Sequence, residues 1–386
     1  NAKASGENSS AIGSFATANN DSSTAIGSGA ATTRENQLVL GTTSTEITAP
    51  ELSGTGKAVV VANSDGTLSR SNISDSGLAS INCVASGDNA VCYGPNANAI
   101  GKNTTAIGAY ANAATSLKTT EFAATAIGSN STAGERYSTA IGANAKAQDN
   151  RTTAAGAGAS ASNNASSAFG YNATASGYRS QTFGAYTEAT QNATTALGYQ
   201  AKALANRSIA LGSFANASEN AAIAIGVSAN ASGLQSLAVG SNASASGDKA
   251  TSIGRGAEAS GFSSTAIGVD SIANKGNAQA IGHNAIASGI NATAIGTSAE
   301  ASGKYSSSFG TEANATAEDA IAVGFLATAS GIDSIAIGTS ALANKANATA
   351  IGTEAKASHN NASAFGDSAI ASGLDSAAFG FKASAS

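Results

Sequence analysis

A three-residue motif, Ala-Ile-Gly or a close variant, returns every 14 residues along most of the chain. It runs without slippage from residues 126–128 to residues 378–380, which is eighteen intervals of 14. A fixed short period means that one supersecondary unit stacks on copies of itself. The sequence therefore predicts a solenoid, a fold that offers a long surface rather than a pocket.

The composition fits a solenoid better than a globular domain. The chain has 386 residues, of which 11% are charged, 5% are aromatic and 42% are hydrophobic, and much of the hydrophobic fraction is Ala. Ordinary domains carry about 25% charged residues, and disordered chains combine high net charge with few apolar residues. Few large side chains are available, so we expect no thick core. No apolar run reaches the roughly 20 residues of a membrane-spanning helix, and we expect any targeting or anchoring segment to lie outside this sequence.

Numbered from the motif Ala as position 1, the repeat reads A-I-G-x-x-A-x-A-S-G-x-x-S-T, and residues 294–307 are a clear copy. Two strands of about five residues plus two turns fill 14 residues, which predicts one coil of an all-β parallel β-roll. Position 10 is often Gly, as at Gly177 and Gly303, and elsewhere is a residue such as Asn163. Because Gly and Asn tolerate positive φ, we expect position 10 to lie in a left-handed turn.

Strand alternation assigns the faces of the roll. The small residues at positions 1, 3, 6 and 8 are predicted to line the inside, while positions 2 and 14 point outward. Position 2 is almost always apolar, and the resulting stripe far exceeds the few hundred Å² that a monomer normally exposes. We expect a second copy of the chain to cover it, in a parallel homo-oligomer. The interface isoleucines would be Ile127, Ile141, Ile225, Ile253, Ile267, Ile281, Ile295, Ile337 and Ile351.

The period breaks twice, and the breaks divide the chain. Residues 1–41 carry repeats, residues 42–86 form a β-rich insert, and residues 87–386 form a continuous roll with six extra residues near 116–123. In the insert, Asp65-Gly66 lies between β-prone runs, which is a hairpin signal. The insert either binds a partner or acts as a spacer.

Cys83 and Cys92 are the two cysteines, nine positions apart. A disulfide is favoured because the rest of the chain is typical of extracellular proteins, and two buried free thiols are the alternative. A zinc site is not expected, because neither of the two histidines is near them.

One cluster of side chains is a candidate ligand-binding surface. Tyr171, Tyr178, Arg179, Tyr186 and Tyr199 occupy turn or variable positions within a short stretch. Tyr and Arg are favoured at binding hot spots. The alternative is that they only decorate turns, as half-exposed tyrosines often do.

No catalytic, cofactor or metal signature emerges. Ser is abundant because the repeat requires it, and no base is placed to activate it. The Gly-rich stretches precede no helix, so they predict no phosphate loop. Lys and Arg are scattered and the net charge is −5, which argues against nucleic acid as a partner.

The motif as it stands at residues 264–268, S-T-A-I-G, resembles the head repeats of trimeric autotransporter adhesins, of the type described for the Yersinia adhesin. The resemblance covers residues 1–41 and about 87–386. It implies a homotrimer of left-handed parallel β-rolls with the Ile column at the three-fold interface. It also implies a bacterial outer-membrane origin, surface exposure, a membrane anchor outside this sequence, and non-enzymatic adhesion to matrix proteins, host cells or solid surfaces, with roles in virulence and biofilms.

Two other functions fit a regular β-solenoid. An ice-binding rod would need a flat exposed Thr column, but the Thr column at position 14 is interrupted by Ile, Leu and Gln. A purely structural spacer is the second alternative. A carbohydrate hydrolase would need paired carboxylates about 5–10 Å apart, and we find no such pair at stacked positions.

Overall fold

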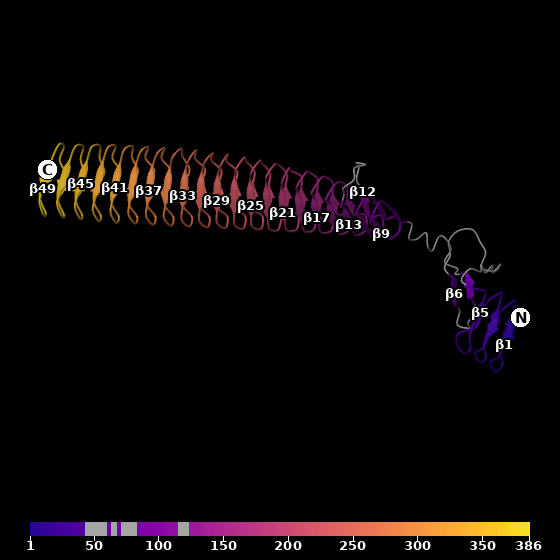
Figure 1. Cartoon of the computed structure of the whole chain (residues 1–386). Coiled ribbons are helices and arrows are strands. Elements are labelled where there is room, and N and C mark those ends of the chain that lie inside the picture. The colour runs from indigo at the N-terminus through magenta and orange to yellow at the C-terminus, as the bar shows by residue number, and fades with distance from the viewer. Residues whose placement is uncertain (43–59, 63–67, 71–82, 115–122) are drawn as a thin grey trace. The chain divides into compact units, whose positions relative to one another are not determined.

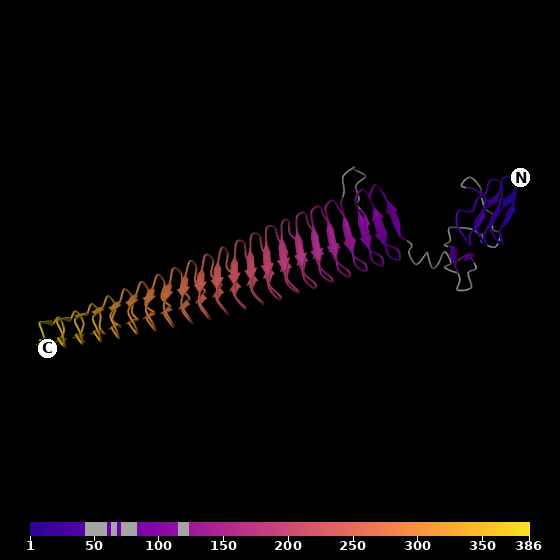
Figure 2. The same ribbon diagram turned by 60° about the horizontal axis from the view of Figure 1, so that its bottom comes forward.

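The computed structural model describes residues 1–42, 60–62, 68–70, 83–114 and 123–386. All regular structure in these residues is β-strand. The chain divides into two compact units, residues 1–80 and 81–386, which Figures 1 and 2 show in two views. The predicted all-β parallel solenoid is confirmed.

The first unit contains short parallel strands and one antiparallel pair. Strand β1 (Lys3–Ala4) pairs with β3 (Thr17–Ala18), and β4 (Thr24–Ile26) lies between β2 (Ser10–Ile12) and β5 (Leu38–Leu40). Strand β6 (Val60–Ala62) pairs antiparallel with β7 (Leu68–Arg70), on either side of the expected Asp65-Gly66 turn. That turn, most of the insert and the expected bulge at 116–122 lie outside the described residues.

The second unit is a roll of two parallel ladders. One ladder runs through β9 (Val91–Tyr93), β11 (Thr105–Ile107), β13 (Thr125–Ile127), β15 (Thr139–Ile141), β17 (Thr153–Ala155), β19 (Ser167–Phe169), β21 (Gln181–Phe183), β23 (Thr195–Leu197), β25 (Ile209–Leu211), β27 (Ile223–Ile225), β29 (Leu237–Val239), β31 (Thr251–Ile253), β33 (Thr265–Ile267), β35 (Gln279–Ile281), β37 (Thr293–Ile295), β39 (Ser307–Phe309), β41 (Ile321–Val323), β43 (Ile335–Ile337), β45 (Thr349–Ile351), β47 (Ser363–Phe365) and β49 (Ala377–Phe379).

The other ladder runs through β8 (Val84–Ser86), β10 (Asn98–Ile100), β12 (Asn112–Ala114), β14 (Thr132–Ala133), β16 (Lys146–Ala147), β18 (Ser160–Ala161), β20 (Thr174–Ala175), β22 (Glu188–Ala189), β24 (Lys202–Ala203), β26 (Asn216–Ala217), β28 (Asn230–Ala231), β30 (Ser244–Ala245), β32 (Glu258–Ala259), β34 (Ile272–Ala273), β36 (Ile286–Ala287), β38 (Glu300–Ala301), β40 (Asn314–Ala315), β42 (Thr328–Ala329), β44 (Leu342–Ala343), β46 (Lys356–Ala357), β48 (Ile370–Ala371) and β50 (Ser384–Ala385).

Each coil contributes one strand to each ladder, in strict 14-residue register, as when Ile267 pairs with Ile281. In the regular coils the two strands have three and two residues, not the five expected, because the turns take more of the repeat. At a coil spacing of ~4.8 Å, the eighteen uninterrupted intervals span roughly 85 Å. Figure 2 shows the coils of this unit following one another along a single axis.

The core of the roll consists mainly of Ala, with some Ser and Thr. Positions 1, 6 and 8 are buried, as Ala266, Ala257 and Ala259 show with no exposed surface. Position 13 is also buried and is Ser, Thr or Ala. Position 3 differs from the expectation: its Gly is mostly half-exposed, because it begins a turn rather than lining the interior.

The two turns of a coil have similar backbone conformations and hydrogen bonds. Positions 5 and 12 both have positive φ, as at Asn144 (φ 58) and Arg151 (φ 55). The turn that precedes position 6 or 13 closes in the same way, since Ala145 N–H donates to Gly142 O at 3.2 Å and Ser138 N–H donates to Glu135 O at 3.2 Å. The 14-residue coil therefore consists of two similar seven-residue halves with different outward-facing side chains.

The expectation that position 10 is left-handed holds only in the first coils of the second unit, where Gly87 and Gly101 have φ 126 and 119. In the later coils it is wrong: Gly177 and Gly303 have no positive φ, and the left-handed residues lie at positions 3, 5 and 12. Gly occurs at position 10 because the coils approach closely there: a Cβ on Gly303 would overlap the carbonyl of Ala317 in the next coil. Position 3 requires Gly for two reasons, positive φ and lack of space, because Gly268 has φ +133 and a Cβ on it would overlap the carbonyl of Gly282.

Three glycines allow these constraints to be tested separately. Gly268→Ala would strain the backbone through its positive φ and would also overlap the next coil. Gly303→Ala would only overlap the next coil. Gly276→Ala would do neither, since the nearest atom to its Cβ is 4.0 Å away. We expect the first two variants to lower the free energy of unfolding by roughly 1–3 kcal/mol or more, as overpacking does. Gly276→Ala should be neutral or slightly stabilising. Thermal unfolding followed by circular dichroism measures this, and equal melting temperatures for all three variants would contradict the packing argument.

Candidate binding surfaces of the roll

The roll presents two faces and two edges. The apolar face carries the side chains of positions 14 and 2, and the polar face carries those of position 7. The first edge consists of the turns at positions 4 and 5, and the second edge of the turns at positions 11 and 12. Because successive turns connect the two ladders alternately, these edges lie on opposite sides of the roll, as Figure 1 shows.

The apolar face is a continuous column of large side chains. All nine predicted interface isoleucines lie on it and keep part of their surface exposed, with Ile141 the most exposed at 44%. Neighbouring coils hold these side chains in register, and Phe169 and Phe183 stack with centroids 4.9 Å apart at an angle of 3°. A single chain thus leaves its largest aliphatic residues outside its own core.

The polar face comes from the same coils and carries mostly Lys, Glu, Asn, Ser and Thr, although Ile272, Ile286, Leu342 and Ile370 interrupt it. The Asn216 amide Nδ2 donates to Asn230 Oδ1 at 2.9 Å, and Lys202 Nζ lies 3.4 Å from Glu188 Oε1. Such exposed pairs contribute little stability. The polar face is suited to contact with solvent.

The predicted Tyr and Arg cluster does not form one surface. Tyr171, Tyr186 and Tyr199 lie on the first edge, in three successive coils. Tyr178 and Arg179 lie on the second edge, where the Arg179 guanidinium stacks 4.9 Å from the Tyr178 ring centroid. The five residues are close in sequence, but alternate turns carry them to opposite edges.

On the first edge the tyrosines form a ladder with a fourth ring that the sequence reasoning missed. Ring centroids are 5.3 Å apart for Tyr171 and Tyr186, 6.0 Å for Tyr186 and Tyr199, and 5.4 Å for Tyr199 and Phe214, each pair edge-to-face. Edge-to-face pairs are favourable beyond their burial. Desolvation and the neighbouring Tyr171 raise the pKa of Tyr186. The sequence signal for Phe214 is its turn position, since the four rings alternate between positions 4 and 5.

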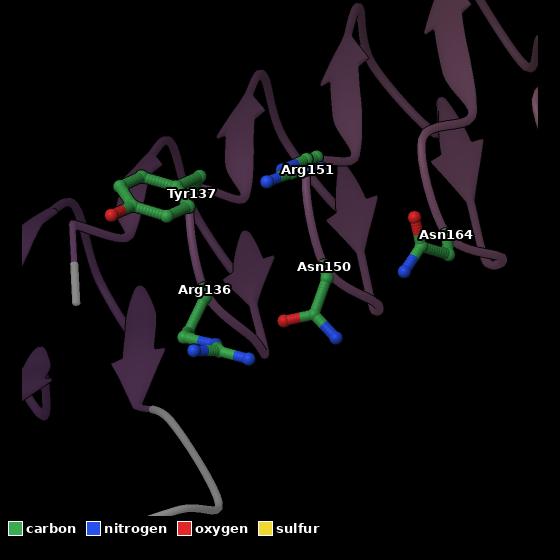
Figure 3. A pocket seen from close by; sticks show the side chains of 5 residues that line it. All are labelled: Arg136, Tyr137, Asn150, Arg151 and Asn164. Atoms are coloured by element: carbon green, nitrogen blue, oxygen red, sulfur yellow. The ribbon is translucent and has the colours of Figure 1, made fainter. Parts of the chain in front are cut away.

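The second edge has a hollow near the start of the regular roll. Arg136, Tyr137, Asn150, Arg151 and Asn164 line it, all from positions 11 and 12 of three consecutive coils (Figure 3). A second hollow on the same edge is lined by Asn206, Arg207, Asn220, Ala221, Leu234 and Gln235. Their volumes are about 210 and 330 Å³, and both communicate with solvent, which suits a ligand that runs along the edge better than an enclosed small molecule.

The described residues contain no group of three or more His, Cys, Asp and Glu side chains arranged to hold a metal ion. His283 and His359 lie at position 4 and position 10 in separate coils. No helix long and apolar enough to cross a membrane occurs in the described part of the chain.

The two cysteines are joined in a disulfide, with Cα atoms 5.9 Å apart. Cys83 stands at position 6 and Cys92 at position 1, two inward positions that are usually small residues in other coils. Both pack against the alanine core beside Ala90. The disulfide therefore crosses the interior at the first described coil of the second unit, where a solenoid needs a cap.

Replacing both cysteines with Ala should keep the fold, because Ala is the usual residue at these positions, but should loosen the first coils. Closing a loop of this size stabilises by roughly 2–3 kcal/mol. We expect faster amide hydrogen exchange in residues 84–107 and unchanged exchange beyond residue 200. Reduced wild-type protein is the matched control, and unchanged exchange near the disulfide in both samples would contradict a capping role.

The family model of the YadA head domain repeat (2 copies) matches residues 4–30, 85–111, 122–145, 136–159, 161–180, 189–215, 217–243, 231–257, 245–271, 259–285, 273–299, 287–313, 301–327, 315–341, 329–355 and 343–369. These matches cover well over half of the chain. No curated protein matches the sequence.

Proposed function

The chain belongs to the head domains of trimeric autotransporter adhesins, and we propose that it is a non-enzymatic head that binds matrix proteins, host cells or solid surfaces. The observation that carries this proposal is the repeated, open surface. Along the described roll, each coil repeats the same faces and edges, so many weak contacts can act together. Linked contacts gain affinity through effective concentration.

We further propose that three copies assemble through the apolar face. Its side chains are half-exposed in one chain, yet they run in register along the whole second unit. Exposed apolar patches of this extent mark interaction sites. A three-fold parallel arrangement would bring all three columns together and leave the three polar faces in water.

The remaining parts of the proposal follow from the family. A head of this kind acts at the bacterial cell surface and contributes to virulence and biofilm formation. The ice-binding alternative gains no support from the geometry: at position 14, Thr265 is half-buried, and other coils carry Ile209 and Leu237 there.

The trimer can be tested with two isoleucines of one coil. Ile281→Asn changes the apolar face, whereas Ile286→Asn, five residues later, changes the polar face. Light scattering of the unaltered chain should give three times 36.9 kDa. We expect Ile281→Asn to shift the mass toward the monomer and Ile286→Asn to leave it unchanged. A monomeric unaltered chain, or the same mass for both variants, would refute the interface.

For ligand contact we propose the aromatic ladder, with Tyr178 and Arg179 as a separate second site. The rings of the ladder present between 42% and 52% of their surface to solvent. Tyr combines a large apolar surface with a polar tip and loses little entropy on binding. The edge-to-face packing also fixes the ladder before any ligand arrives.

We expect Tyr171→Ser, Tyr186→Ser and Tyr199→Ser together to lower adhesion to basement-membrane extract roughly tenfold, which corresponds to about 1.4 kcal/mol. The double variant Tyr178→Ser and Arg179→Ser changes the two cluster residues on the second edge and shows whether the second edge contributes to adhesion. Adhesion of the purified head to coated and bare plastic is the readout, with the trimer mass checked for each variant. Unchanged adhesion after both sets of changes would remove all five residues from consideration.

A further inference from the structure

Arginine recurs at a regular interval on the second edge. Arg151, Arg179 and Arg207 all occupy position 12, with Ala165 and Ala193 at position 12 of the coils between them. The arginines are 28 residues, or two coils, apart, so their Cα atoms repeat at roughly 9.6 Å along the roll. All three are exposed. The intervening alanines are too short to fill the space between neighbouring arginines.

Main-chain conformation and hydrogen bonds fix the Cα position of each arginine. The φ values are 55 for Arg151, 56 for Arg179 and 59 for Arg207. Their N–H groups donate to the previous coil, Arg151 to Arg136 O at 2.8 Å, Arg179 to Asn164 O at 3.0 Å and Arg207 to Asn192 O at 2.9 Å. Turns bonded in this way keep the spacing of the three Cα atoms constant, so the arginine side chains start from evenly spaced points along the edge.

Amide side chains surround the arginines. Position 11 is Asn in nearly every coil of this stretch, and Tyr178 replaces it once; the asparagines are Asn150, Asn164, Asn192, Asn206 and Asn220. Asn192 Oδ1 accepts from Tyr178 N–H at 3.2 Å, and Asn206 Oδ1 accepts from Asn192 N–H at 3.3 Å. These bonds orient the amides along the edge. Figure 3 shows Asn150 and Asn164 beside Arg151 in the first hollow.

From Glu135 to Gln235, positions 10 to 12 hold four arginines and three carboxylates, a net charge of +1, although the whole chain carries −5. Positions 11 and 12 hold no carboxylate from Arg136 to Gln235. The nearest acids are at position 10, namely Glu135, Asp149 and Glu219, and Asp149 Oδ1 accepts from Asn150 N–H at 2.6 Å. At positions 11 and 12 of these turns, an anion would therefore contact arginines and amides, with the carboxylates at position 10 beside them.

We propose that the stretch of the second edge from Arg136 to Gln235 binds a linear acidic polysaccharide that carries one carboxylate or sulfate per disaccharide, extended along the roll. Guanidinium groups bind carboxylates and sulfates through paired hydrogen bonds. One cation every two coils is comparable to the length of a disaccharide. The amides supply donors and acceptors for sugar hydroxyls, and Tyr137 and Tyr178 supply ring faces for sugar stacking.

A nucleic acid fits this edge less well. Each strand of a DNA duplex carries a phosphate every ~3.4 Å, far denser than these arginines. Single-stranded nucleic acid needs an aromatic ring for successive bases, whereas this stretch of the edge has Tyr137 and Tyr178 three coils apart. The inference rests on the proposed adhesive function and names a ligand class for a surface distinct from the aromatic ladder.

The test is binding of hyaluronan fragments, with one carboxylate per disaccharide, to the whole chain by calorimetry at low salt. Arg151→Gln, Arg179→Gln and Arg207→Gln together should weaken binding by about tenfold or more, since charge-assisted bonds are lost. Lys146→Gln, Lys202→Gln and Lys356→Gln together remove the same charge from the polar face and should leave binding unchanged. Keratan sulfate in place of hyaluronan distinguishes sulfate from carboxylate as the preferred anion.

A second variant tests the spacing at constant composition. Arg179→Ala with Ala193→Arg moves one charge by one coil, and we expect weaker binding of hyaluronan than with the unaltered chain. Equal binding by this variant, equal loss in the Lys variants, no binding by the unaltered chain, or equally tight binding of single-stranded DNA would each overturn the proposal. Adhesion to basement-membrane extract, measured on the same proteins, reports separately on the proposed function.

Discussion

The approach of backbone to backbone at position 3 is the constraint on which the rest of this protein depends. Adjacent coils are drawn together by main-chain hydrogen bonds, such as Gly142 N–H to Ile127 O at 2.7 Å. At that separation no side chain fits between the stacked motif glycines. The same closeness leaves room inside only for small residues, so the core consists of Ala with some Ser and Thr. Large apolar residues have no place in the interior, and the coil carries them on its outer surface.

That arrangement separates two tasks by geometry. The faces of the roll consist of strand residues held at fixed spacing, and they suit packing against other copies. The edges consist of turn residues, whose side chains vary from coil to coil without disturbing the hydrogen-bonded ladder. Ligand contacts can therefore change along the edges, as the aromatic ladder and the arginine series do, while the apolar column stays constant.

Much of this fold could be predicted from the sequence, because the repeat length is always 14 residues in the regular roll and inward and outward side chains alternate along each strand. Ile267 and Ala266 lie on opposite sides of their strand, as the pattern predicts. The conformation of the turns was harder to predict. Gly303 indicated a left-handed residue, but it occupies its site for lack of space, and residues with no such preference, such as Ala193 and Leu326, adopt positive φ. Spacing between coils is a property of the stack and cannot be seen in one repeat.

The predicted Tyr and Arg cluster also shows that positions in space cannot be inferred from one repeat. Tyr178 and Tyr171 are seven residues apart, which is half a coil, and so they lie on opposite edges, whereas Phe214 reaches Tyr199 from the next coil. In a solenoid, residues that are close in sequence can therefore lie on opposite edges, and residues a full coil apart can be neighbours.

The similarity of the two halves of the coil has a consequence for how such a rod can change its length. Loss or gain of seven residues would preserve the inward small residues, and it would join matching turns wherever position 10 is a left-handed Gly, as at Gly87 and Gly101. Every later coil would then present its Ile column on the polar side. Only additions in multiples of 14 keep the faces continuous, so the outward side chains set the permitted lengths even where the main chain would accept steps half as large.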